Sequence, residues 1–132
     1  MVASVHNYAG TEEKSEAFHY SQAVKFGNIV KTSGQGGWDN SGKVVPDLKK
    51  QVELAFSNVE KALQAADTRL SWKNVYAVRS FHISLDETAD YVIENFRKFT
   101  PERRPVFTCV EIRKLGIEGM QVEIEVEALI ES

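Results

Sequence analysis

The chain has very little cysteine and histidine. Cys109 is the only cysteine among 132 residues, and the three histidines, His6, His19 and His82, stand far apart. One thiol cannot form an internal disulfide bond, and this spacing does not resemble a set of metal ligands. The glycine-rich segment 34–37 lacks the patterns of phosphate loops and dinucleotide-binding turns. The sequence therefore predicts no disulfide, no metal site and no cofactor, and it favours a reducing compartment.

Long apolar runs and an excess of positive charge are also missing. Residues 1–8 have neither an apolar segment nor a basic flank, so they predict neither a secretory signal nor a membrane span. We therefore expect a cytosolic protein without a membrane partner; a cleaved transit peptide that precedes this sequence would leave a mitochondrial location open. The formal net charge is −3, from 16 basic and 19 acidic side chains, which disfavours binding to nucleic acids.

Proline is scarce too, with three residues, and no Pro/Ser-rich linker or repeat divides the chain. Apolar residues make up 42% and charged residues 27%, which is typical of a globular domain. We interpret residues 1–132 as one domain with one core.

The order of predicted elements is ββαβαββ. Residues 17–26 and 28–33 read as two strands that form a hairpin broken at Gly27, and residues 75–85, 106–113 and 121–130 read as three later strands. Asp47 is expected to cap a long amphipathic helix that Asp67 ends. Asp86 is expected to cap a second helix that ends before Pro101. The sequence leaves open an extra strand over 43–45.

Two helices can cover only one face of such a sheet. We therefore predict an α+β fold with a single sheet, both helices on one face, and the other face open to solvent, ligand or another subunit. The second helix should direct Ala89, Val92, Ile93, Phe96 and Phe99 to the core. On the strand over 106–113 two sets of side chains alternate, and one case is that the β-branched set faces the helices. Phe107, Cys109 and Glu111 would then lie on the open face.

Five segments together resemble the RidA/YjgF (Rid, L-PSP) family. They are 20–24 (YSQAV), 32–35 (TSGQ), 51–63 (QVELAFSNVEKAL), 104–111 (RPVFTCVE) and 122–128 (VEIEVEA), and they follow the order found in the family. The resemblance implies a chorismate-mutase-like fold. It also implies a homotrimer whose sheets form a central barrel, with three small-molecule clefts between subunits.

The resemblance also implies a set of site residues. Carried over by position, these are Glu123 as the catalytic group and Tyr20, Ser33, Gln35, Phe107 and Cys109 as substrate-binding groups. Phe107 stands where the active family members have an arginine that holds the substrate carboxylate. Because the loop before the last strand blurs the register, Glu125 is the fallback for Glu123. Simpler interpretations compete: Glu123 as a solvated strand carboxylate, Cys109 as a small buried apolar residue, and Tyr20, Ser33 and Gln35 as ordinary turn residues.

The family reaction that the resemblance implies is hydrolysis of enamines and imines to a carbonyl compound and ammonia. Without the arginine, an imine derived from an amino acid loses its anchor, so the chain is either an enzyme for altered substrates or a noncatalytic, regulatory binder of a metabolite. A third alternative is an endoribonuclease acting on single-stranded RNA, against which the acidic balance of charge weighs.

Overall fold

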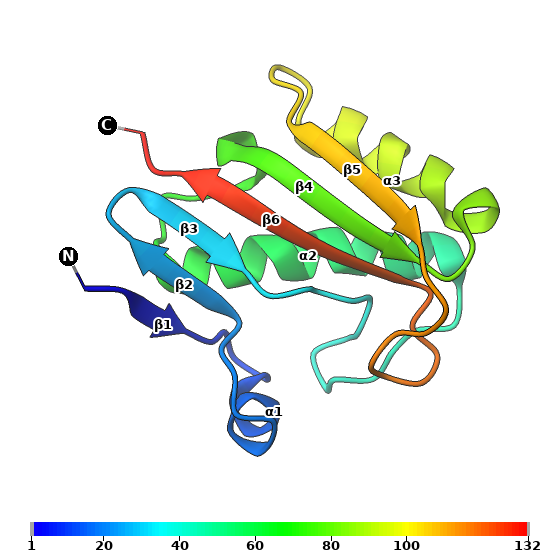
Figure 1. Ribbon diagram of the computed structural model, residues 1–132, viewed down its shortest axis with the longest axis horizontal. Coiled ribbons are helices and arrows are strands. Elements are labelled where there is room, and N and C mark those ends of the chain that lie inside the picture. Colours follow the sequence, from blue (N-terminus) through cyan, green and yellow to red (C-terminus); the bar gives the residue numbers. More distant parts are fainter. Residues whose placement is uncertain (1, 132) are drawn as a thin grey trace.

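The fold is built on a six-stranded sheet (Figure 1). The computed structural model describes residues 2–131 of the chain. The strands lie in the order β1-β2-β3-β6-β4-β5, and all neighbours are antiparallel except β4 and β5. Their bounds are β1 Ser4–His6, β2 Ala23–Phe26, β3 Ile29–Thr32, β4 Val75–His82, β5 Val106–Glu111 and β6 Val122–Leu129. The helices are α1 Glu12–Ala17, α2 Leu48–Ala66 and α3 Leu85–Phe99, with a 3₁₀ turn at Trp72–Asn74.

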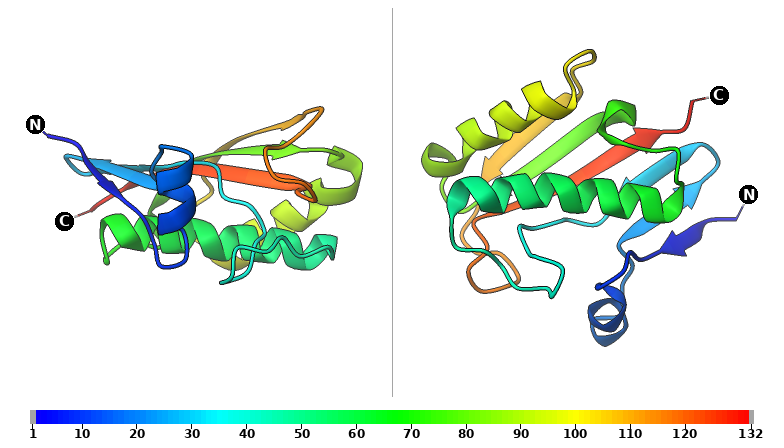
Figure 2. Two further views of the ribbon diagram at one scale, coloured as in Figure 1. Left: turned by 90° about the horizontal axis from the view of Figure 1, so that it is seen from below. Right: turned by 180° about the vertical axis from the view of Figure 1, so that it is seen from behind.

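The two long helices, α2 and α3, cover the same face of the sheet, as the sequence predicts (Figure 2). Beneath them, β6 contributes a row of fully buried side chains: Val122, Ile124, Val126 and Ala128. Phe56 of α2 stacks on Trp72 with ring centroids 4.4 Å apart, and its ring also meets Phe96 of α3. The α+β prediction with both helices on one face is therefore confirmed.

The ends of α2 also agree with the sequence pattern. The Asp47 carboxylate accepts a hydrogen bond from the backbone N–H of Lys50 at 3.0 Å, which satisfies one free donor of the first turn. At the other end, Asp67 pairs with Lys25 at 2.9 Å and with Arg69 at 2.7 Å. The hydrogen bonds from Arg69, followed by that from Lys25, hold the pKa of Asp67 well below its usual range.

Several element boundaries differ from the predictions. Residues 12–17 form α1 and β2 starts only at Ala23, because a turn with His19 in the left-handed region (φ +56°) separates them. The short strand β1 was not predicted. The helix α3 begins one residue before Asp86, with Ser84 at its N-cap position. Ile93 is 38% exposed rather than buried, and residues 43–45 contribute one isolated bridge, between Trp38 and Val44.

The condition considered for β5 does not hold, because its β-branched residues do not face the helices. In the parallel register, Phe107, Cys109 and Glu111 stand beside Val78, Ser80 and His82, which are the buried residues of β4. The Phe107 ring meets Phe96 of α3 edge to face, with centroids 4.8 Å apart, and Glu111 Oε1 accepts from the Leu85 N–H at 3.1 Å.

The side chains of Phe107, Cys109 and Glu111 therefore point towards α3, while Val106, Thr108 and Val110 lie on the open face. The reason is that α3 leaves an aromatic edge for Phe107 to cover, and this contact outweighs the β-branched pattern.

His82 of β4 is a fully buried histidine between two hydroxyl groups. Its Nδ1 lies 2.6 Å from Thr88 Oγ1 and its Nε2 lies 2.7 Å from Ser80 Oγ. Because Thr88 Oγ1 donates its proton to the Ser84 carbonyl, Nδ1 carries the imidazole proton and Nε2 accepts from Ser80. Burial lowers the pKa of His82 from its ordinary value, so the ring is neutral.

We expect the free energy of unfolding to fall as pH drops below 6.5, the ordinary pKa of histidine. In that range the unfolded chain binds a proton that folded His82 does not, which costs at most about 1.4 kcal/mol per pH unit. Well above pH 6.5 both states are neutral and His82 adds no slope. Urea unfolding at pH 7.5 and 5.5 measures the difference, which should shrink in His82→Gln. Identical pH slopes in the parent and the variant would contradict this account.

Candidate functional site

A pocket of about 290 Å³ lies where the ends of β3 and β6 meet α1 and two loops. Tyr20 follows α1, Ser33 follows β3 and Glu123 belongs to β6, and all three line this pocket. The remaining lining consists of Lys14, Phe18, Gly34, Trp38, Gly116, Ile117 and Met120. Side chains that are far apart in the sequence, including three of those that the family resemblance implies, thus surround one cavity.

The loop after β3 holds the floor of the pocket against β6. Gln35 and Ile124 exchange backbone hydrogen bonds of 2.8 and 2.9 Å, which continue the sheet past the end of β3. Gly34 thereby lies against the Glu123 side chain, and a Cβ at this position would overlap the Glu123 carboxylate. A side chain at residue 34 would therefore require the Glu123 side chain to move.

Two hydroxyl groups of the pocket have complementary hydrogen-bonding roles. Ser33 Oγ donates to the Ser21 carbonyl at 2.7 Å, so its oxygen can accept a proton from a ligand. Tyr20 Oη accepts from the Gln22 side-chain amide at 3.1 Å, which leaves its own proton available to a ligand. The pocket therefore offers one acceptor and one donor at defined positions.

Gln35 lies beneath the pocket rather than in its lining, and it is fully buried. Its Oε1 accepts from the Tyr8 hydroxyl at 2.7 Å, and its Nε2 donates to Gln22 Oε1 at 2.8 Å. The Trp38 indole N–H donates to Tyr8 Oη at 3.1 Å. The Gln22 amide also reaches Tyr20, so this buried network connects two lining side chains, Trp38 and Tyr20.

The two charged groups of the lining are Glu123 and Lys14. Burial raises the pKa of Glu123, the charge of Glu125 raises it further, and Lys14 opposes both effects. Burial lowers the pKa of Lys14, and Glu123 opposes that effect. The Lys14 ammonium lies 4.2 Å from the centroid of the Trp38 ring. Each charge is thus partly removed from water within the same cavity.

The structure separates Glu123 from the other two carboxylates of β6. Arg79 of β4 pairs with Glu125 at 2.7 Å and with Glu127 at 3.1 Å, and Tyr76 donates to Glu127 at 3.2 Å. Glu125 and Glu127 are thus neutralised in the middle of the open face and do not line the pocket. Glu123 is the β6 carboxylate that lies beside Tyr20 and Ser33.

Phe107 and Cys109 lie outside the pocket. They belong to β5, which β4 separates from β6 in the sheet. Cys109 is exposed rather than buried as a small apolar residue, because β5 forms an edge of the sheet. Within one chain the structure therefore brings together Tyr20, Ser33 and Glu123 and leaves Phe107 and Cys109 apart.

Sequence reasoning missed Lys14, Phe18, Ile117 and Met120 in the lining. The sequence predicts no element at Lys14 and a strand at Phe18, although the segment 12–17 is helical. A short helix leaves little periodicity to detect, so no signal in the sequence marked Lys14. Ile117 and Met120 belong to a loop whose path the sequence does not define.

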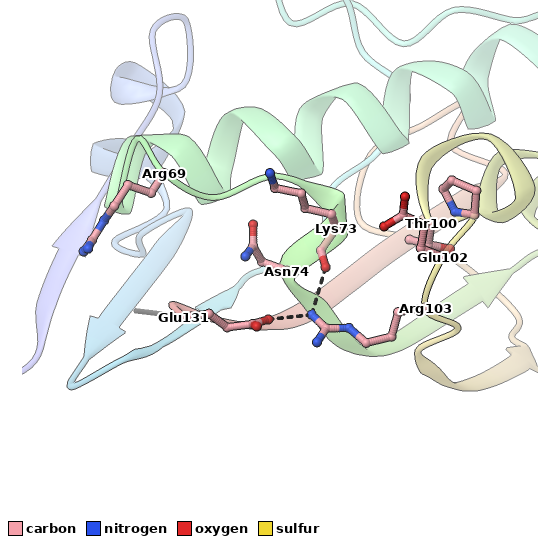
Figure 3. Close-up of a pocket in the computed structure, with 8 residues that line it drawn as sticks. Arg69, Lys73, Asn74, Thr100, Glu102, Arg103 and Glu131 are labelled. Atoms are coloured by element: carbon pink, nitrogen blue, oxygen red, sulfur yellow. Dashed lines mark hydrogen bonds and ion pairs between the residues drawn. The ribbon is translucent and has the colours of Figure 1, made fainter.

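A larger pocket, of about 730 Å³, has a different lining. Figure 3 shows Arg103 within it, reaching across to Glu131 at 2.8 Å and to the backbone carbonyl of Lys73 at 2.9 Å. Arg103 is therefore already paired, and we do not treat this surface as the candidate site. Among residues 2–131 no cluster of side chains has the composition of a metal site, and no helix is long and apolar enough to cross a membrane.

The family model described as Endoribonuclease L-PSP matches residues 11–130. The RutC family protein YjgH of Escherichia coli K12 is 31% identical over 123 residues, which are 92% of this chain and 91% of that protein. The mitochondrial protein mmf2 of Schizosaccharomyces pombe is 26% identical over 83% of this chain and 85% of its own length.

A solved structure of protein YjgH superimposes with a TM-score of 0.86 at 28% identity, and the match covers 100% of this chain and 99% of that one. The chain therefore belongs to the Endoribonuclease L-PSP family, the RidA/YjgF family that its sequence resembles.

We expect Gly34→Ala to displace the Glu123 carboxylate from the pocket. The overlap should cost about 1–3 kcal/mol of stability, and the pKa of Glu123 should fall towards 4.5 as the group moves into water. Unfolding curves and a carboxyl titration by NMR measure the two effects. Gly116→Ala is the matched control, because a Cβ at this other lining glycine meets no atom within 4 Å. Equal effects of the two substitutions would show that the contact with Glu123 does not matter.

Proposed function

We propose that this chain hydrolyses reactive imines and enamines to a carbonyl compound and ammonia, and that the pocket around Glu123 is the reaction site. The observation that supports the proposal most is the partly buried Glu123 carboxylate beside the hydroxyls of Tyr20 and Ser33. The family pattern assigns roles in the cleft to these three residues, and a single small cavity of about 290 Å³ suits a small metabolite.

The proposed reaction needs modest help from the protein. Water adds to the carbon of the C=N bond while a proton is delivered to its nitrogen; the resulting aminoalcohol then loses ammonia and leaves the carbonyl group. Because the pKa of Glu123 is raised, its protonated form is more populated near neutral pH than that of an exposed glutamate. Glu123 would deliver the proton and then accept one from the attacking water, while Tyr20 and Ser33 orient the substrate.

We further propose that the pocket is completed in a homotrimer, as the family resemblance implies. The open face of the sheet presents apolar side chains that a partner chain could cover, among them Val5, Phe26, Val106 and Val110. Phe107 and Cys109 would reach a pocket only from a neighbouring chain, because β5 lies away from Glu123 within one chain. The cytosol remains our proposed location.

A noncatalytic role, in which the same pocket binds a metabolite for regulation, is the alternative. It is supported by Phe107, which offers no charge at the position where active family members have arginine. Cleavage of single-stranded RNA is less favoured, since the pocket lining has one cation and the net charge is negative.

The proposal predicts measurable hydrolysis of imines released by an amino-acid oxidase. Glu123→Gln should lower kcat by about a hundredfold or more, the usual size of a general acid–base contribution. Tyr20→Phe should lower it less. Glu125→Gln is the matched control, because this carboxylate lies on the same strand and face but pairs with Arg79 outside the pocket.

Turnover that survives both Glu123→Gln and Tyr20→Phe would overturn the site assignment. If the parent protein does not exceed the protein-free blank but Phe107→Arg does, the scaffold is intact and the noncatalytic alternative is favoured. Salt-sensitive cleavage of RNA that persists through repurification would favour the nuclease instead.

The homotrimer predicts a particle with three times the 14.9 kDa mass of one chain in light scattering. Val110→Lys should weaken the assembly, because it inserts a charge into the open face of β5, where Val110 is 40% exposed in the single chain. Lys49→Gln, at an exposed position of α2, should leave the mass unchanged. A monomeric parent protein would remove the trimer and the shared pocket together.

A further inference from the structure

Lys14 supplies a positive charge to the pocket that no ion pair neutralises. It lies in α1, is half-buried, and lines the cavity together with Phe18 and Trp38. Among residues 2–131, no carboxylate lies within ion-pair distance of the Lys14 ammonium group. The face of the Trp38 ring at 4.2 Å stabilises the ammonium only in part. A cation held in such a place favours a ligand that brings a negative charge.

The position of Lys14 is fixed by the residues around it rather than by chance at the surface. The next residue, Ser15, is buried; its hydroxyl donates to Asn7 Oδ1 at 3.0 Å and accepts from the Gln22 amide at 3.1 Å. Thr11, at the start of α1, donates to the Tyr8 carbonyl at 2.6 Å. The short helix is therefore tied to Gln22, the residue before β2, and to the buried network under the pocket, which fixes the backbone that carries Lys14.

The two charges of the lining suit one chemical pattern. Lys14 and Glu123 share the cavity without forming a direct ion pair, so a ligand can lie between them. A 2-imino acid has its carboxylate on the carbon next to the C=N group, and protonation of that group adds a positive charge close to the negative one. Its carboxylate would face Lys14, its iminium group would face Glu123, and an apolar side chain would contact Trp38 and Met120.

We propose that Lys14 is the residue that binds the carboxylate of the substrate. The anchor comes from α1 of the same chain and not from the β5 position that Phe107 occupies. The reaction in this inference rests on the proposed function. The binding of a carboxylate by Lys14 does not depend on it.

Binding of the 4-methyl-2-oxopentanoate anion tests the anchor without turnover. We would measure its dissociation constant by calorimetry in the full chain and compare it with that of the uncharged methyl ester. Lys14→Gln should weaken binding of the anion by roughly ten- to a hundredfold, the range expected for a charge-assisted hydrogen bond, while leaving the ester nearly unchanged. Lys14→Arg should retain most of the affinity. Lys49→Gln, which removes an exposed lysine of α2, should change neither constant.

Kinetics with imines from an amino-acid oxidase give the second readout. Lys14→Gln should raise KM for an aliphatic imino acid far more than it lowers kcat, because a carboxylate anchor binds ground state and transition state alike. If Lys14-dependent binding of the anion occurs without any turnover, the anchor stands and the proposed hydrolysis fails. If turnover occurs but Lys14→Gln leaves KM unchanged, the hydrolysis stands and the anchor is overturned. No saturable binding of the anion, or equal binding of anion and ester, also overturns it.

Discussion

The alternation along β6 is the constraint on which the rest of the structure depends. Every second side chain of this central strand is fully buried beneath α2, and each of Glu123, Glu125 and Glu127 points to the opposite face. A shift of one residue would move three carboxylates into the core, so the register is fixed by the cost of burying charge. The position of Glu123 in the pocket is therefore a direct consequence of the core on the other side of the sheet.

A buried hydrogen-bond network connects the sheet to the wall of the pocket. Tyr8, Gln35 and Gln22 form its centre, and among residues 2–131 no buried side-chain polar atom lacks a partner. Such a network is stable only when every member is satisfied, so it holds the N-terminal segment in a single arrangement. Burial also raises the pKa of Tyr8, which keeps its hydroxyl protonated as a donor to Gln35. The pocket thus has a rigid floor made of uncharged groups beneath two charged side chains.

The parts of the fold that follow from long periodic patterns were predictable. The helix α2 spans 19 residues, with its cap at Asp47, and β6 shows strict alternation, so both were recognised from the sequence. The helix α1 has six residues and no periodic signal, and its existence depends on the side chains of Asn7, Ser15 and Gln22 meeting in the folded state. Local propensity does not contain that information.

The residues of the candidate site were also predictable only in part. Tyr20, Ser33 and Glu123 were found because the family pattern names them, whereas Lys14 depends on the path of α1. The orientation of Phe107 was mistaken because it is decided by a contact with Phe96 on another element and not by the residues beside it. Tertiary contacts between distant segments explain each of these failures.

The pairing of β5 has a consequence for how an isolated chain behaves in solution. β5 has only one neighbour, the parallel strand β4, and all six of its residues are exposed although Val106, Phe107 and Val110 are apolar. An exposed edge strand of this composition has unpaired backbone groups that can pair with a strand of another chain, as in the early steps of aggregation. An isolated chain therefore leaves the backbone of β5 open to pairing with a strand of another chain, and such pairing becomes faster as the concentration of chains rises.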